Sequence, residues 1–277
     1  MKKHLTNILI VLIAITGLSF LLYPTVSDYL NSRTYRRTIT DYVRTVSQLD
    51  NEEYKEVLNA AREYNEALGE EGFVPFNMPE ERLERYLTLL DVTGTGIMGY
   101  IEIPSVNIYL PIYHGSDEAV LQNGVGHLEW SSLPVGGESS HSVLSGHTGL
   151  PSSKLFTDID QLAERDIFTI RVLNETFTYE VDRILTVLPA EVSSLRIEKG
   201  MDYCTLITCT PYGINSHRLL VRGHRIETPE DTPDAEEQIA ILSEAEIIDS
   251  IKIVLIVAVP VLILIGIILI ARRRKRK

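Results

Sequence analysis

The stretch MDYCTLITCTPYGINSHRLLVRGHRIE, residues 201–227, decides the fold, because two runs of strand-forming residues flank a short turn. Residues 201–211 and 217–227 are rich in aliphatic, aromatic and β-branched side chains, and YGINS at 212–216 supplies the glycine and asparagine that favour turns. We predict an antiparallel strand pair. It carries Cys209 to the end of the first strand and brings Arg218 roughly level with it.

The chain has two cysteines, and the strand prediction excludes a disulfide between them. Cys204 and Cys209 would lie about 16 Å apart at roughly 3.3 Å per residue, whereas a disulfide needs Cα atoms within about 7 Å. Their odd spacing also points the side chains to opposite faces. We interpret Cys204 as a small apolar residue. Cys209 stays open between an apolar residue and a nucleophile, because a reactive thiol needs a partner that stabilises its anion.

Short β-runs between turn residues continue over residues 93–228. A hairpin is expected to turn at Asn174-Glu175, and residues 152–164 read as a helix with a serine cap. The other predicted elements are strands at 97–104, 106–115, 140–147, 166–173 and 176–189 and a helix at 116–124. So many short strands in about 130 residues predict a mainly β fold with a closed or nearly closed barrel.

Residues 25–92 form a helical region that precedes the barrel. Apolar stripes predict two helices within residues 28–70, and Asp50 with Glu53 resembles a capping box between them. The stripe residues are Tyr35, Ile39, Tyr42, Val43 and Val46, then Tyr54, Val57, Leu58 and Ala61. A connector, GEEGFVPFNMPEE at 69–81, leads to a short helix at 82–90.

Two uncharged apolar stretches, residues 5–23 and 253–271, are each long enough to cross a bilayer as a helix. We assign residues 1–24 to an amino-terminal membrane helix, 252–271 to a second one that Pro260 kinks, and 229–251 to an acidic tether. Lys2, Lys3 and the basic tail 272–277 predict that both termini are cytoplasmic and that the middle of the chain is extracellular. The alternative for the first stretch is a cleaved signal peptide, which its length and the lack of a small-x-small site disfavour.

The charge distribution argues against a nucleic-acid partner. The formal net charge is −12, and eight of the 26 lysines and arginines lie in the two tails. Residues 24–252 therefore hold 18 cationic and 38 anionic side chains, a balance of −20 that repels phosphate backbones. The sequence also shows no dense cluster of histidine, cysteine and carboxylate ligands, so we expect neither a metal nor a cofactor.

His147 is the candidate partner of the thiol among the seven histidines. It follows a hydrophobic strand in LSGHTGLP (144–151), where Gly146 and Gly149 permit a tight backbone and close approach of a substrate. By itself a loop histidine is more often incidental than functional. Arg222 and Arg225 lie further along their strand and are expected to be structural.

Four stretches together resemble a class C sortase, the pilin-polymerising transpeptidase type of Gram-positive bacteria. They are GIMGYIEIP (96–104), LPIYHG (110–115), SVLSGHTGLP (142–151) and TLITCTPYGINSHRLLVRG (205–223). The resemblance covers residues 93–226 and implies a sortase-type closed β-barrel with Cys209 as nucleophile, His147 as general acid and base, and Arg218 as oxyanion stabiliser. It implies no metal.

The resemblance also implies the substrates. An LPxTG-like sorting signal on a pilin or surface protein would be cut between Thr and Gly, and a lysine amine of a pilin subunit would accept the acyl group at the outer membrane surface. The alternatives are a sortase that attaches surface proteins to the cell-wall peptide and a non-catalytic membrane scaffold. Class C sortases usually carry a lid with an Asp-Pro-aromatic motif, which residues 70–86 lack. Either Phe73 and Phe76 around Pro75 replace it as a hydrophobic plug, or the lid is absent or loose.

Overall fold

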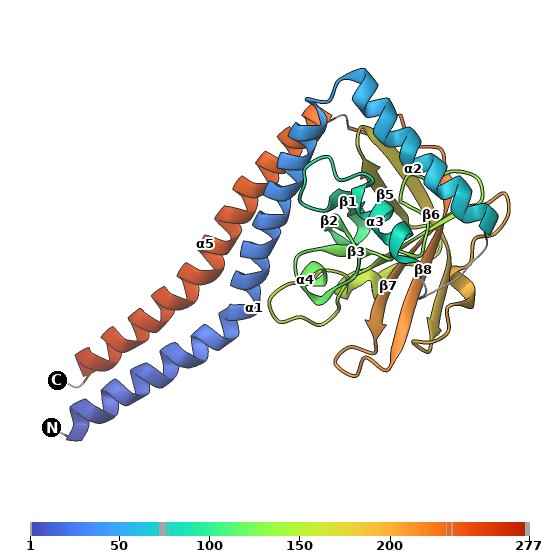
Figure 1. The fold of residues 1–277 in the computed structure, drawn as a ribbon. Helices are drawn as coiled ribbons and strands as arrows, with labels where there is room; N and C mark the ends of the chain where they lie inside the picture. Colours follow the sequence, from blue (N-terminus) through green and yellow to red (C-terminus); the bar gives the residue numbers. More distant parts are fainter. Residues whose placement is uncertain (1, 72–75, 77, 231, 234, 275–277) are drawn as a thin grey trace.

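The computed structural model describes residues 2–71, 76, 78–230, 232–233 and 235–274, and in these residues eight strands close into one barrel (Figure 1). The strands follow the order β1-β2-β3-β4-β7-β8-β6-β5 around the barrel. The pairs β2–β3 and β4–β7 are parallel and the others antiparallel. The bounds are β1 (Ile97–Ile103), β2 (Ile108–His114), β3 (Val125–His127), β4 (Ser140–Ser145), β5 (Ile167–Val172), β6 (Glu175–Val187), β7 (Asp202–Thr210) and β8 (His217–Ile226). The mainly β closed barrel is confirmed.

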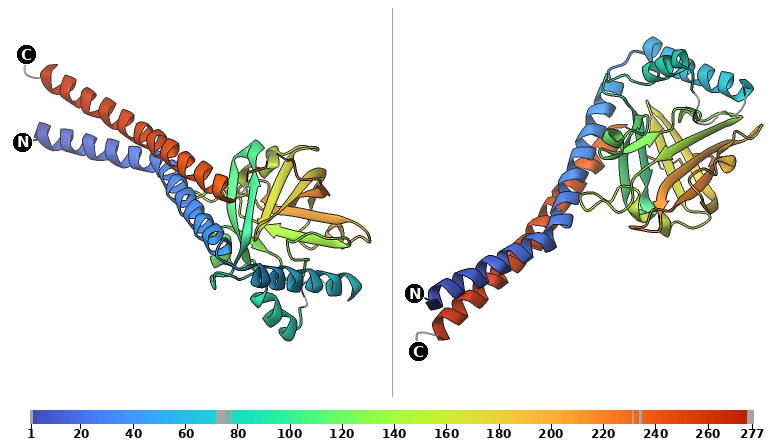
Figure 2. Two further views of the ribbon diagram at one scale, coloured as in Figure 1. Left: turned by 90° about the horizontal axis from the view of Figure 1, so that it is seen from above. Right: turned by 60° about the horizontal axis from the view of Figure 1, so that its bottom comes forward.

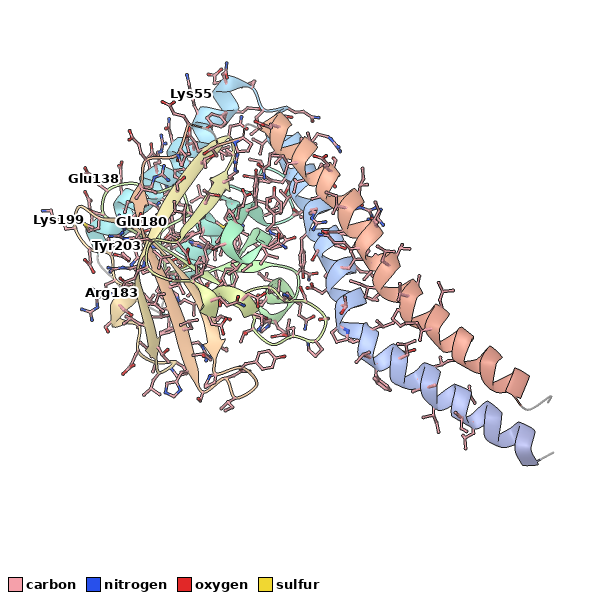
Figure 3. The ribbon with its side chains drawn as sticks, turned by 180° about the vertical axis from the view of Figure 1, so that it is seen from behind. Lys55, Glu138, Glu180, Arg183, Lys199 and Tyr203 are labelled. Carbon is pink, nitrogen blue, oxygen red and sulfur yellow. The ribbon has the colours of Figure 1, made fainter. Side chains whose placement is uncertain are left out.

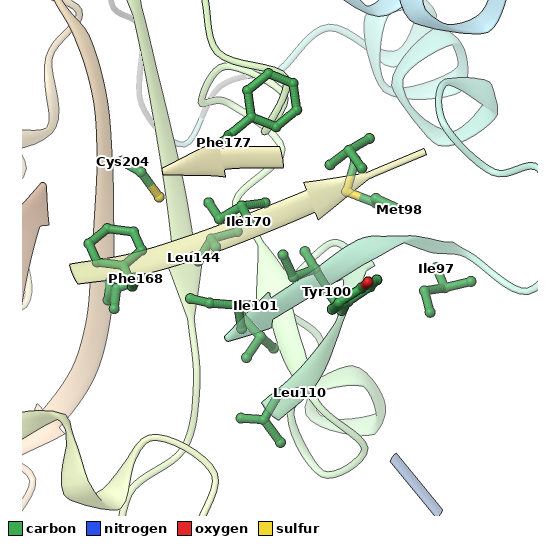
Figure 4. Close-up of a cluster of buried hydrophobic side chains, with 14 of the residues drawn as sticks. Ile97, Met98, Tyr100, Ile101, Leu110, Leu144, Phe168, Ile170, Phe177 and Cys204 are labelled. Carbon is green, nitrogen blue, oxygen red and sulfur yellow. The ribbon is translucent and has the colours of Figure 1, made fainter. Parts of the chain in front are cut away.

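The barrel interior is filled by aliphatic and aromatic side chains, as the alternation of side chains along each strand requires (Figure 4). Phe168, Leu144 and Cys204 are fully buried there. Burial raises the pKa of the Cys204 thiol well above its usual value, so this cysteine stays protonated. Both cysteines are free, which confirms the prediction that they form no disulfide.

Two helices precede the barrel where the apolar stripes predicted them, and most of the stripe residues are buried. The helices are α1 (Lys2–Val46), α2 (Asn51–Glu71), α3 (Glu80–Thr88), α4 (Glu118–Leu121) and α5 (Ala235–Arg274), with 3-10 turns η1 (Pro104–Val106), η2 (Thr157–Gln161) and η3 (Ser193–Leu195). The Asp50 carboxylate accepts the Glu52 and Glu53 N–H groups at 2.8 and 2.9 Å, and the Glu53 carboxylate accepts the Asp50 N–H at 3.3 Å. The predicted capping box therefore starts α2.

Two local predictions were wrong. Residues 152–164 contain only the 3-10 turn Thr157–Gln161 as regular helix. The backbone groups of Ser152 and Lys154 form hydrogen bonds with side chains of α1 instead of helical ones. The β5–β6 hairpin turns one residue earlier than predicted, at Leu173-Asn174, because Val172 pairs with Glu175 and Leu173 adopts a positive φ of 54°.

The segment expected to be an acidic tether is helical from residue 235 onward. It continues without a break into the second apolar stretch as α5, which runs beside α1 away from the barrel (Figures 1 and 2). Arg36 pairs with Asp249 at 2.5 Å, and Arg33 pairs with Glu246. These contacts pair two acidic side chains of the segment with arginines of α1 and link the two helices. In the described residues, one helical stretch, Leu12–Val46 within α1, is long and apolar enough to cross a membrane.

Candidate active site

Cys209 and Arg218 lie directly opposite each other on neighbouring antiparallel strands. Cys209 is the penultimate residue of β7 and is partly exposed, and Arg218 is the second residue of β8. Directly paired side chains project to the same face about 5 Å apart at Cβ. The Arg218 Nη1 group donates to the carbonyl oxygen of His217 at 3.1 Å, which orients the guanidinium at the strand end. The two residues are therefore level, as the turn YGINS predicted.

His147 follows β4, on the other side of β7. The parallel register pairs Ser145 with Ile207, and the Gly146 N–H donates to the Ile207 carbonyl at 3.0 Å. β4 ends at Ser145, and the same register carried two residues further would set position 147 level with position 209. The Thr208 hydroxyl donates to the Gly146 carbonyl at 2.7 Å, a bond that ties the residue before the thiol to the residue before the imidazole. The fold thus brings all three predicted residues to the same end of three adjacent strands.

A carboxylate that the sequence reasoning missed faces the histidine. The Glu118 Oε2 atom is 3.4 Å from His147 Nε2, and Gln122 Nε2 donates to Glu118 Oε1 at 2.9 Å. The Gln122 hydrogen bond and then the nearby imidazole lower the pKa of Glu118. Glu118 is exposed at the start of the four-residue helix α4, and only the fold brings it near His147.

An apolar surface adjoins the thiol on the outer face of the barrel. We call it the outer apolar cluster, and its buried members are Trp130, Val143, Leu195, Ile207 and Leu220. Ile207 and Leu220 pair with each other two residues away from Cys209 and Arg218, so all four share one face. Phe76 of the connector lies 5.6 Å from the Trp130 ring, centre to centre, and Met78 packs on the cluster. The other two residues of the predicted plug, Phe73 and Pro75, lie outside the described residues.

Buried hydrogen bonds through His141 of β4 hold the loop between β6 and β7 against the barrel. The His141 Nδ1–H group donates to the Arg196 carbonyl at 2.9 Å, and the Thr205 hydroxyl donates to His141 Nε2 at 2.7 Å. Burial lowers the pKa of His141 to about 4, so the ring is neutral near neutral pH. The neutral His141 ring thus links the loop to β7 through Arg196 and Thr205.

Arg222 is structural, as predicted. It stacks 4.0 Å over the Tyr203 ring and pairs with Asp182 at 2.7 Å and Glu198 at 3.4 Å. Figure 3 shows Tyr203 on the side of the barrel away from the two long helices. Among the described residues, no group of three or more histidine, cysteine or carboxylate side chains could hold a metal ion.

The fold and this arrangement match one protein family. The family model described as "Sortase domain" matches residues 101–226. Sortase D of Bacillus subtilis is 30% identical over 131 residues, which are 46% of this chain and 63% of that protein. Sortase A of Staphylococcus aureus is 32% identical over 119 residues, which are 42% of this chain and 56% of that protein. The chain thus covers less than two thirds of these relatives.

Solved structures give a fuller match. Sortase C1 of Streptococcus agalactiae is 52% identical with a TM-score of 0.68, and the match covers 70% of this chain and all of that one. Sortase C of Streptococcus pneumoniae is 42% identical (TM-score 0.63, covering 69% and 97%). A Clostridium perfringens sortase C is 44% identical (0.61, covering 69% and 99%). The chain belongs to the sortase family of cysteine transpeptidases, and within it to class C, which confirms the resemblance.

Proposed function

We propose that the protein is a membrane-anchored transpeptidase that polymerises pilin subunits through a thioester on Cys209. The observation that supports the proposal most is the register that sets Cys209 opposite Arg218, beside the end of β4 from which His147 follows. The similar structure from Streptococcus pneumoniae is described in terms of catalysis and pilin substrate specificity, and the one from Clostridium perfringens holds a carboxy-terminal cell wall sorting motif. We infer an LPxTG-like signal, cut between Thr and Gly, as the substrate.

The first half of the reaction forms the thioester. The Cys209 thiolate attacks the Thr carbonyl carbon, and the negative charge that develops on the carbonyl oxygen is stabilised by the Arg218 guanidinium. The His147 imidazolium donates a proton to the Gly nitrogen, the C–N bond breaks, and the Gly-bearing fragment leaves as an amine. Arginine suits this position because its charge does not titrate and its planar donors fit an oxyanion.

The second half transfers the acyl group. A lysine amine of a neighbouring pilin subunit attacks the thioester carbonyl, His147 accepts the proton that the amine loses, and the thiolate leaves. The product is an isopeptide bond, and the enzyme returns to its starting state. Glu118 lies beside the path of this proton, since it contacts His147 Nε2.

The outer apolar cluster is the surface that we assign to the apolar residues of the sorting signal. It continues from the Cys209–Arg218 pair along the same face. Phe76, although 70% exposed, lies against the Trp130 ring, and Met78 packs on the cluster, so we assign these two residues the role of a plug that the substrate must displace. We propose this plug in place of the Asp-Pro-aromatic lid that the chain lacks.

We further propose two membrane spans, with both termini cytoplasmic and the barrel outside. Large apolar side chains of α1 and α5, such as Phe20 (76% exposed) and Leu262 (65% exposed), find no protein partner to cover them. Lipid would cover them. Protease added outside intact spheroplasts should digest the barrel and spare tags at both termini, and loss of either tag would contradict this topology.

The experiment for the function supplies the full chain in detergent with an LPxTG peptide and two acceptors, a pilin domain and a cell-wall peptide amine. Mass spectrometry should identify the pilin isopeptide as the product. Cys209→Ala should abolish cleavage, whereas the matched control Cys204→Ala should keep it. Cleavage by Cys209→Ala would refute the mechanism, and a cell-wall product alone would favour the anchoring alternative.

A further inference from the structure

The loop that carries His147 is bonded to the membrane-proximal helix. We call residues 146–156 the histidine loop. Three side chains of α1 bond to its middle: the Asp28 carboxylate accepts the Lys154 N–H at 2.8 Å, Asn31 Nδ2 donates to the Ser152 carbonyl at 2.8 Å, and the Tyr35 hydroxyl is 3.1 Å from the Ser153 hydroxyl. These partners are more than 110 residues apart in the sequence. They succeed one another along one face of α1.

The far end of the loop fixes His147 itself. The Phe156 N–H donates to the His147 carbonyl at 3.0 Å. The Phe156 ring is fully buried, and a Cβ added at Gly146 would come within 2.6 Å of its Cγ atom, which is too close. Gly146 is therefore required for this close approach. Because Phe156 is only two residues from Lys154, a displacement of the bonded segment moves the backbone of His147.

Both hydrogen bonds and packing locate the loop on α1, since Leu155 and Tyr35 belong to the same buried cluster. A cavity of about 390 Å³ lies between α1, α5, the β1–β2 connection and the loop, and Asp28, Tyr35 and Lys154 border it. Close-packed apolar contacts are thus interrupted at this junction. The polar bonds from α1 border this cavity, where packing alone leaves space.

The helix that makes these bonds is itself held by its neighbour. Arg36 of α1 pairs with Asp249 of α5 at 2.5 Å, and the Tyr29 hydroxyl is 2.7 Å from the Ser250 hydroxyl. All three views show α1 and α5 side by side as they leave the barrel (Figures 1 and 2). A continuous set of contacts therefore leads from the helix pair to the histidine loop.

We infer that Asp28, Asn31 and Tyr35 are positioning residues for His147, so that the anchoring helix is part of the catalytic apparatus and sets the imidazole against the Cys209 thiol. This inference rests on the proposed function, because it needs His147 to act in the transfer. Catalytic geometry is sensitive to such support, since a misplacement of about 1 Å can lower a rate by about 100-fold. The competing role is a purely structural one, in which the bonds stabilise the fold and leave the chemistry unchanged.

The test uses the full chain in lipid nanodiscs and measures kcat and KM for transfer from a sorting peptide. Asp28→Ala combined with Asn31→Ala should lower kcat at least tenfold with KM within about twofold of wild type. Tyr35→Phe, which keeps the buried ring, should lower kcat about threefold. The single variant Asp28→Asn keeps an oxygen that can accept the Lys154 N–H. It should retain at least half of the wild-type kcat.

The matched control is Thr34→Ala, which removes an exposed hydroxyl that bonds within α1, to the Leu30 carbonyl. It should leave kcat unchanged. Wild-type kcat in both Tyr35→Phe and the double variant would overturn the inference, whatever their melting temperatures. If the double variant fails to fold, Tyr35→Phe alone decides. A wild-type protein without any transfer would instead refute the proposed function.

Discussion

Thr208 offers a sharp test of how the site is held together. Its side chain is 4% exposed, and its hydroxyl donates to the Gly146 carbonyl at 2.7 Å. This bond joins β7 directly before Cys209 to the start of the histidine loop. Thr208→Val keeps the shape of the side chain and removes the donor, so the Gly146 carbonyl loses this partner in a buried position.

The expected cost follows from that loss. A buried acceptor without its donor costs about 1–3 kcal/mol in the free energy of unfolding, and the released Gly146 carbonyl lets His147 move, which we expect to lower kcat roughly tenfold. Thr208→Ser retains the hydroxyl and should recover most of both. Ser142 is the matched control. Its buried hydroxyl on β4 has no hydrogen-bond partner among the described residues, so Ser142→Ala should cost little or stabilise the protein.

The assay combines urea unfolding with transfer kinetics on the same preparations. Thr208→Val should unfold at lower urea than wild type with an unchanged slope, and its kcat should fall with it. Wild-type stability and kcat in Thr208→Val, or an equal loss in Ser142→Ala, would refute the reasoning that this bond ties the thiol strand to the histidine loop.

Three further predictions follow from the site. Arg218→Ala should lower kcat by about 100- to 1,000-fold with a small change in KM, and Arg218→Lys should not fully restore it, as steady-state kinetics would show. Phe76→Ala should uncover the outer apolar cluster and speed both peptide cleavage and thiol labelling of Cys209; unchanged rates would argue against a plug. Unfolding free energy should fall as the pH drops from about 6.5 towards 4, because the unfolded chain binds a proton that burial denies to His141, whose folded pKa is about 4. The loss of stability from this ring is roughly 3 kcal/mol, at about 1.4 kcal/mol per pKa unit. Urea titrations at several pH values should show a smaller loss in His141→Asn. The control His217→Asn should show the same loss as wild type.

Local sequence patterns predicted the elements whose periodicity is strong. The stripe that begins at Tyr35 and Ile39 is buried as expected, and the strand pair around YGINS has the predicted level register of Cys209 with Arg218. Both features depend on neighbours close in the sequence. That is why they can be read from residue order alone.

Long-range pairing was beyond local patterns. The position of His147 depends on the parallel pairing of β4 with β7, about 60 residues apart, and the sequence supplied it only through family resemblance. Glu118 and Thr208 were missed because their partners are brought near by the fold. The false helix at 152–164 and the expected tether share one cause: both segments bond to α1, which local propensity does not record.

The central claim is that the sulfur of Cys209 becomes acylated by the sorting signal, and intact-protein mass spectrometry tests it most directly. Wild-type protein quenched in acid after mixing with an LPxTG peptide, without an acceptor amine, should gain the mass of the peptide up to Thr, less one water. Digestion should place this hydroxylamine-sensitive adduct on Cys209. No adduct during active turnover, or the same adduct in Cys209→Ala, would contradict the account.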